Sequence, residues 1–128
     1  MKTPGAAMTR QSKDPAALIP LKHSTYRVLL ALADGERHGY AIMQTLSEMT
    51  RGREAILPGT LYAALARMVD EGLIEMREGP RDEASGGPKR RYYRRTSFGR
   101  AVARAESERL RALLEIAQAQ RIISGGTR

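Results

Sequence analysis

The run from Leu57 to Ile74, LPGTLYAALARMVDEGLI, limits what this chain can fold into more than any other stretch. Pro58-Gly59-Thr60 predicts a helix start, because proline suits a first turn and Thr60 can cap it. Gly72 predicts where the helix ends. Four apolar residues at helical spacing should face inward: Leu61, Leu65, Met68 and Val69. The opposite face should carry Thr60, Tyr62, Ala63, Ala66, Arg67 and Asp70. The run therefore predicts a short helix with one exposed face.

A pair of strands is predicted directly after this helix. Leu73 to Arg77 has the length of a strand, with Ile74 and Met76 turned inward. Residues 79–88 are rich in Gly and Pro, with Gly86-Gly87 at the expected turn, and residues 90–96 form the return strand. Alternation along that strand places Tyr92 and Arg94 on one face, and Arg91, Tyr93 and Arg95 on the other. A helix followed by a cationic hairpin is typical of a winged helix-turn-helix domain.

Further helices are predicted on both sides of this unit. Helical spacing of apolar residues indicates helices over about 22–33 and 40–50, and Thr96 or Ser97 can cap a final helix reaching about residue 120. Asp14-Pro15 can start a short helix near the N-terminus. We divide the chain into a flexible tail or short helix (1–19), a winged helix-turn-helix domain (20–96), a C-terminal dimerisation helix (97–122) and a disordered tail (123–128). The fold class is mainly α (α+β), with a two-stranded β wing.

The final helix has one polar and one apolar stripe. Arg104–Glu108 and Arg111–Glu115 lie four residues apart on the polar stripe, as expected for an exposed helix. The opposite stripe, which we expect to form a dimer interface, contains Val102, Leu110, Leu113, Leu114 and Ala117. No later element is available to cover it, and packing back on the chain's own domain is the alternative.

Charge and composition narrow the classes of function. The net charge is +8, and residues 77–95 hold seven basic and three acidic residues, a surplus of 7 − 3 = +4. This points to a polyanionic partner. With no Cys and two His, neither a thiolate site nor a His cluster is available, and no phosphate-binding Gly loop is present. We expect no enzyme activity, no cofactor and no metal. Without a signal peptide or an apolar run long enough for a membrane span, we expect a cytoplasmic protein.

Several of these motifs together resemble the PadR-like transcriptional regulators. The resemblance covers about residues 20–120 and rests on His38-Gly39-Tyr40-Ala41-Ile42, Leu57-Pro58-Gly59-Thr60-Leu61-Tyr62, Glu71-Gly72-Leu73-Ile74, and Lys89 to Arg94 with Thr96 and Gly99-Arg100. It implies a homodimer, usually a repressor, bound to a near-palindromic operator, and in many members release by a small ligand. The chain departs from the family pattern at Ala63, Ala66, Arg95 and Ser97-Phe98, and it has no Trp for the ligand stacking of some short relatives.

The predicted function is sequence-specific binding of a double-stranded DNA operator. The candidate contacts are Thr60, Tyr62, Arg67, Lys89, Arg90 and Arg91. Tyr62 could instead pack at the rim of the core, and Arg67 could be a solvated surface charge. His38 is expected to cap a turn, and Tyr40 to pack into the domain. A small basic RNA-binding protein and a protein-interaction module are the alternatives; one Phe and no Trp leave few aromatic side chains for stacking on bases.

Overall fold

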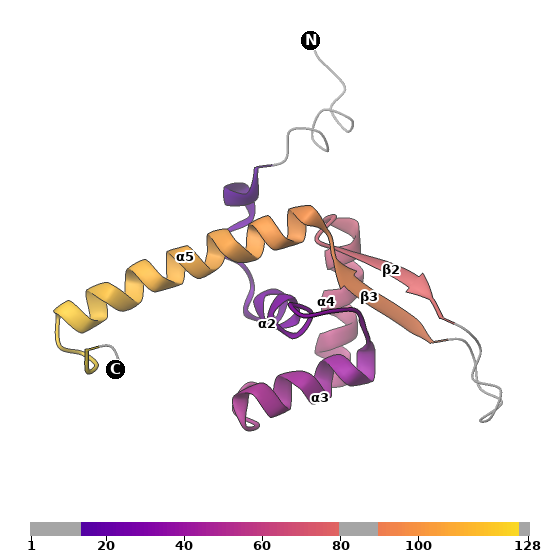
Figure 1. Cartoon of the computed structure of the whole chain (residues 1–128), viewed down its shortest axis with the longest axis horizontal. Coiled ribbons are helices and arrows are strands. Elements are labelled where there is room, and N and C mark those ends of the chain that lie inside the picture. Colours follow the sequence, from indigo (N-terminus) through magenta and orange to yellow (C-terminus); the bar gives the residue numbers. More distant parts are fainter. Residues whose placement is uncertain (1–13, 80–89, 126–128) are drawn as a thin grey trace, which may run out of the picture.

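Helices dominate the computed structural model, which describes residues 14–79 and 90–125. In these residues the order is η1 (Pro15–Leu18), α2 (His23–Ala31), β1 (Arg37–His38), α3 (Gly39–Thr50), α4 (Pro58–Asp70), β2 (Ile74–Glu78), β3 (Arg91–Arg95) and α5 (Ser97–Ala119). Figure 1 shows α2, α3 and α4 grouped below α5, with β2 and β3 extending to one side as the wing. The winged helix-turn-helix fold is confirmed.

Local signals account for most helix ends. The side chains of Asp14, His38 and Thr96 accept the capping hydrogen bonds at the starts of η1, α3 and α5. Gly72, at φ +78°, follows the end of α4 in a conformation that favours glycine. One expected cap is wrong: Leu57 occupies the N-cap position of α4 without a side-chain hydrogen bond, so Thr60 does not cap this helix.

The wing is joined by a third strand that sequence patterns do not reveal. The antiparallel sheet has the order β1-β3-β2, with Arg37 opposite Tyr93 and Met76 opposite Tyr93 on the other side. Two residues are too few to show an alternating pattern, so β1 was not predicted. Its pairing places His38, and therefore the start of α3, directly beside the wing.

The core lies between α2, α3, α4 and the start of α5. It includes the expected Leu61, Leu65 and Met68, and also Val28 and Leu73. Two apolar residues expected to face inward, Val69 and Met76, are instead exposed. They sit at the edges of their elements' apolar faces, where spacing alone does not decide burial. No helix in residues 14–79 and 90–125 is both long and apolar enough to span a membrane.

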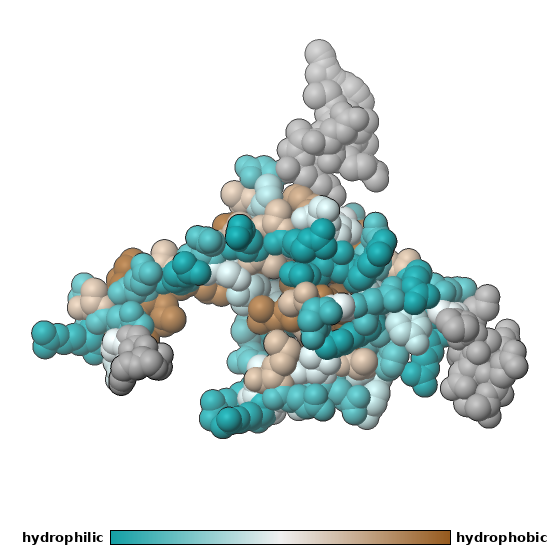
Figure 2. Space-filling model, viewed as in Figure 1, coloured by the Kyte–Doolittle hydropathy of each residue, from teal (hydrophilic) through white to brown (hydrophobic). Residues whose placement is uncertain are grey.

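α5 has two halves with different surroundings. Its first half packs on η1 and α2, and Val102 there is completely buried. The expectation that Val102 contributes to a dimer interface is therefore wrong, because its side chain fills the core of its own domain. The second half projects away from the other helices (Figure 1), and apolar residues gather along its underside (Figure 2). The exposed apolar residues of this half include Leu110, Leu113, Leu114 and Ile116.

Candidate nucleic-acid interface

The exposed face of α4 is short and has few functional groups. Thr60, Tyr62, Ala63 and Ala66 are exposed on it, as the sequence predicts. Tyr62 is 50% exposed. Its ring lies over Gly39, so it joins α4 to the start of α3 while keeping part of its surface accessible. Thr60 and Tyr62 are thus the exposed hydrogen-bond donors of this face among those the sequence singled out, and the exposed Asp70 is an acceptor at its far end.

Arg67 does not belong to that face. Its Nη2 donates to Thr25 Oγ1 at 3.1 Å and to Ser24 Oγ at 3.4 Å, both on α2. Thr25 is buried, so the guanidinium satisfies a hydroxyl at the interface between α2 and α4. The expectation of an outward-facing Arg67 is wrong, because residue spacing places the Cα but not the end of a long, flexible side chain.

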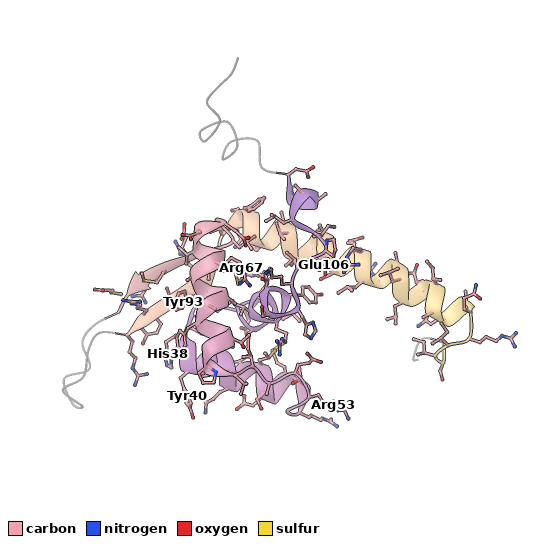
Figure 3. All side chains as sticks on the ribbon, turned by 180° about the vertical axis from the view of Figure 1, so that it is seen from behind. His38, Tyr40, Arg53, Arg67, Tyr93 and Glu106 are labelled. Carbon is pink, nitrogen blue, oxygen red and sulfur yellow. The ribbon has the colours of Figure 1, made fainter. Side chains whose placement is uncertain are left out.

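A hollow of about 540 Å³ lies between the start of α3, α4 and β3. His38, Gly39, Tyr40, Tyr62, Arg90, Arg91 and Tyr93 line it. Tyr40 is 60% exposed, so the expectation that it packs into the domain is wrong. Figure 3 shows the labelled His38, Tyr40 and Tyr93 on the side of α4 from which the wing extends. The pairing of β1 with β3 brings together groups that are about fifty residues apart in the chain.

His38 holds the corner where α3 meets the wing. Its Nδ1 accepts from the Ala41 N–H at 3.3 Å, which confirms the predicted cap, and its Nε2 lies 3.0 Å from Arg90 Nη1. Burial and the nearby Arg90 charge lower the pKa of His38. The imidazole is therefore neutral near pH 7 and has one acceptor nitrogen. While His38 caps α3, that acceptor is Nδ1. A hydrogen bond from Arg90 requires Nε2 to be the acceptor, so the cap and the Arg90 contact need different tautomers.

Tyr93 forms the floor of the hollow. It is buried, so one face of β3 places a tyrosine on the domain. Burial raises the pKa of its phenol, the largest of several influences that include Arg91. The hydroxyl is therefore protonated at neutral pH and can donate a hydrogen bond.

Two arginines of the wing form ion pairs with glutamates. Arg77 forms a two-pronged ion pair with Glu36, at 2.7 Å for each contact, and Arg94 pairs with Glu75 at 2.9 and 3.0 Å. Glu36 and Glu75 lie outside the stretch that was counted as cationic, so the surplus of charge on the hairpin is smaller than its composition indicates. Arg90 and Arg91 line the hollow, and Lys89 and Gly86-Gly87 lie outside the described residues.

Sequence reasoning missed Gly39 as a site residue. A methyl group at this position would lie 2.5 Å from the Tyr62 hydroxyl oxygen, so glycine is needed for Tyr62 to lie where it does. The signal was present in the His38-Gly39-Tyr40 run, but the contact it serves is between α3 and α4 and has no signature along the chain.

Residues 28–105 match the transcriptional regulator PadR-like family. The chain belongs to this family. It is 38% identical over 91 residues to the transcriptional regulator Rv3488 of Mycobacterium tuberculosis, a match covering 71% of this chain and 76% of that protein. An uncharacterized protein of Lysinibacillus sphaericus is 38% identical over 74 residues, which cover 58% of this chain and 65% of the relative, just under two thirds of its length.

Solved structures of PadR-like proteins share the fold. A transcriptional regulator from Clostridium thermocellum is 25% identical with a TM-score of 0.65, covering 74% of this chain and 89% of that one. Bacillus subtilis PadR in complex with operator DNA is 23% identical with a TM-score of 0.58, covering 71% of this chain and 48% of that one. The second likeness supports the fold, and it shows that a protein of this fold binds operator DNA.

Proposed function

We propose that this PadR-like regulator binds an inverted-repeat operator as a homodimer and represses transcription. The observation that carries the proposal is the arrangement of Arg90, Arg91 and three tyrosines around one hollow beside the exposed face of α4. Release of DNA by a small ligand is the part of this proposal that rests on the family resemblance alone.

α4 is the element we place in the major groove. Its exposed Ala63 and Ala66 allow close approach to the duplex, while Thr60 and Tyr62 supply donors to phosphates or base edges. Two alanines in the middle of the face leave little direct base reading, so sequence preference should depend in part on DNA shape. Arg67 is not part of the interface, because its guanidinium is bonded to α2.

Arg90 and Arg91 are the groups we place on the phosphate backbone next to the groove, with Lys89 beside them as the sequence predicts. Arg90 can exchange the His38 imidazole for a phosphate without losing an ion pair to that residue, because His38 is neutral. A phosphate oxygen is a stronger partner for a guanidinium than an imidazole already engaged as a cap. These contacts raise affinity for any duplex and weaken as salt is added.

A second copy of the chain is the partner we assign to the projecting half of α5. Leu110, Leu113, Leu114 and Ile116 are exposed there, and Ala117 is half-buried. They continue the stripe that begins with the buried Val102. Pairing of two such helices would remove the apolar surface from water and relate the two α4 helices by twofold symmetry. Symmetric copies read an inverted repeat with half-sites about 34 Å apart.

Footprinting on the DNA upstream of the chain's own gene, combined with sedimentation, tests this function. The expected result is a dimer that protects an inverted repeat, with binding that weakens as salt rises. A strictly monomeric protein, or one that binds structured RNA more tightly than any duplex at matched salt, would overturn the proposal.

A further inference from the structure

Glu106 lies at the point where α5 leaves the domain. It is 2% exposed, an unusual position for a carboxylate. Val102 and Ala103, one turn earlier, are buried in the core, whereas Glu108 and residues 110–116 are exposed. Figure 3 shows Glu106 on the side of α5 that faces the rest of the domain. The last fixed contacts of α5 with its own domain are therefore concentrated at Glu106 and its neighbours.

Glu106 and the next residue, Ser107, fix α5 at this point. Arg109 holds the Glu106 carboxylate through Nε and Nη2, each at 2.8 Å, and the nearby Leu21 backbone is a smaller influence that also favours its ionised form. Ser107 Oγ donates to the Ala103 carbonyl at 2.8 Å, which leaves the Tyr26 hydroxyl of α2 to donate to Ser107 Oγ at 2.7 Å. Tyr26 thus binds α5 to α2 directly beside the buried Glu106.

Stability alone does not explain a charged group at this position. Burying the Glu106 carboxylate removes a charge from water, and apolar residues of similar size often stabilise a fold as well or better. Apolar packing would, however, let α5 slide or rotate on α2, since dispersion contacts have little directionality. Hydrogen bonds of fixed length and angle restrict that freedom. The arrangement is better suited to setting an angle than to adding stability.

The angle between α5 and its domain matters because the helix continues well beyond Glu106, and a small rotation there moves its far end. From Glu106 to Ala119 the helix extends by about 20 Å at 1.5 Å per residue. A rotation of about 10° at Glu106 moves its far end by about 3.5 Å, close to the 3.4 Å rise of one base pair. Two copies paired through their α5 helices would each contribute such a displacement. A small change of angle therefore corresponds to a different spacing of half-sites.

We propose that Glu106 and the Tyr26–Ser107 hydrogen bond set the spacing between the two α4 helices, and with it the half-site spacing that the regulator accepts. They are positioning residues, remote from the DNA. The proposal rests on the homodimeric function above, and it adds the elements that determine which operator geometry is read.

The distance between the two α4 helices provides a direct test. The chain has no Cys, so Ala66→Cys on the exposed face of α4 gives one spin label per subunit. Pulsed electron–electron double resonance then reports the distance between the two labels of the dimer. We expect a narrow distribution for the labelled parent and a broader or shifted one for Glu106→Gln and Tyr26→Phe. Glu108→Gln removes the same charge from the exposed side of the same helix and should leave the distribution unchanged.

The affinity for DNA provides the functional readout. It is measured for the footprinted duplex and for derivatives that carry one base pair more or fewer at the centre. The unaltered protein should bind the altered duplexes about tenfold more weakly, whereas Glu106→Gln and Tyr26→Phe should discriminate less than about threefold. Tyr26→Phe removes a single hydroxyl and keeps the test valid if Glu106→Gln fails to fold. Unchanged distances and unchanged discrimination in both variants would overturn the inference while leaving the proposed function intact. A monomeric parent protein would overturn both.

Discussion

Tyr62 of α4 lies directly over Gly39 at the start of α3, so that the Tyr62 ring packs against the backbone of that helix. The contact makes Tyr62 part of the helix junction as well as part of the exposed face. Gly39→Ala should therefore displace the Tyr62 ring, whose far end is flexible, at little cost in stability. We expect operator affinity to fall about fivefold, equivalent to about 1 kcal/mol, in fluorescence anisotropy.

A double-variant cycle separates this effect from a general one. In a Tyr62→Ala background the ring is absent, and the further change Gly39→Ala should have no effect on affinity. An equal loss in both backgrounds would show that the Gly39 effect does not act through Tyr62.

Salt dependence should identify the arginines that contact phosphate. Arg90→Ala and Arg91→Ala are each expected to weaken binding to all duplexes and to make the slope of log K against log salt shallower by about 1. Arg94→Ala removes the same charge from the wing, but its guanidinium is already paired with Glu75 and should change the slope less. Equal slopes for all three variants would contradict a specific role for the hollow.

Arg67 should contribute to the stability of the fold and not to DNA binding. Arg67→Met keeps the aliphatic part of the side chain and removes its hydrogen bonds to Ser24 and the buried Thr25. The free energy of unfolding should fall by about 1–2 kcal/mol in urea denaturation, with DNA affinity of the folded protein unchanged. Loss of affinity without loss of stability would restore Arg67 to the interface.

Substitutions at two apolar residues of α5 should affect different properties, namely stability at Val102 and oligomeric state at Leu113. Val102→Ala opens space in the core and should lower the free energy of unfolding by about 1–3 kcal/mol, with little effect on oligomeric state. Leu113, which is 52% exposed, should behave differently. Leu113→Glu places a charge on the proposed dimer surface and should give monomers in sedimentation velocity, with the domain still folded. A dimer that persists in Leu113→Glu would place the interface elsewhere.

Acid should weaken the contact around Glu106. The ion pair with Arg109 holds the pKa of Glu106 below its usual value. The ionised form therefore stabilises the folded protein above the ordinary Glu pKa of about 4.3. That contribution is lost as the pH falls from there through the lower pKa of the folded state. Urea denaturation between about pH 3 and pH 6 should show a steeper loss of stability in the unaltered protein than in Glu106→Gln.

The order and approximate bounds of the main helices could be predicted from sequence, because they depend on residues close together in the chain. Pro58 and Gly72 mark the two ends of α4, and Thr96 caps α5, through interactions within one turn of each residue. The strands of the wing followed from their length and alternation. The family motifs combine such local signals, which is why the fold class and the family could be predicted together.

The site and the interface depended on contacts between distant residues. Val102 and Leu113 are both apolar and lie on one stripe of α5, yet one is buried and the other exposed because the rest of the domain covers only half of the helix. The Arg67 guanidinium donates hydrogen bonds to two hydroxyls of α2 that are more than forty residues away in sequence. Periodicity records which face of a helix is apolar. Only the tertiary structure decides what lies against that face, because packing partners are brought together by the fold and leave no regular spacing in the chain.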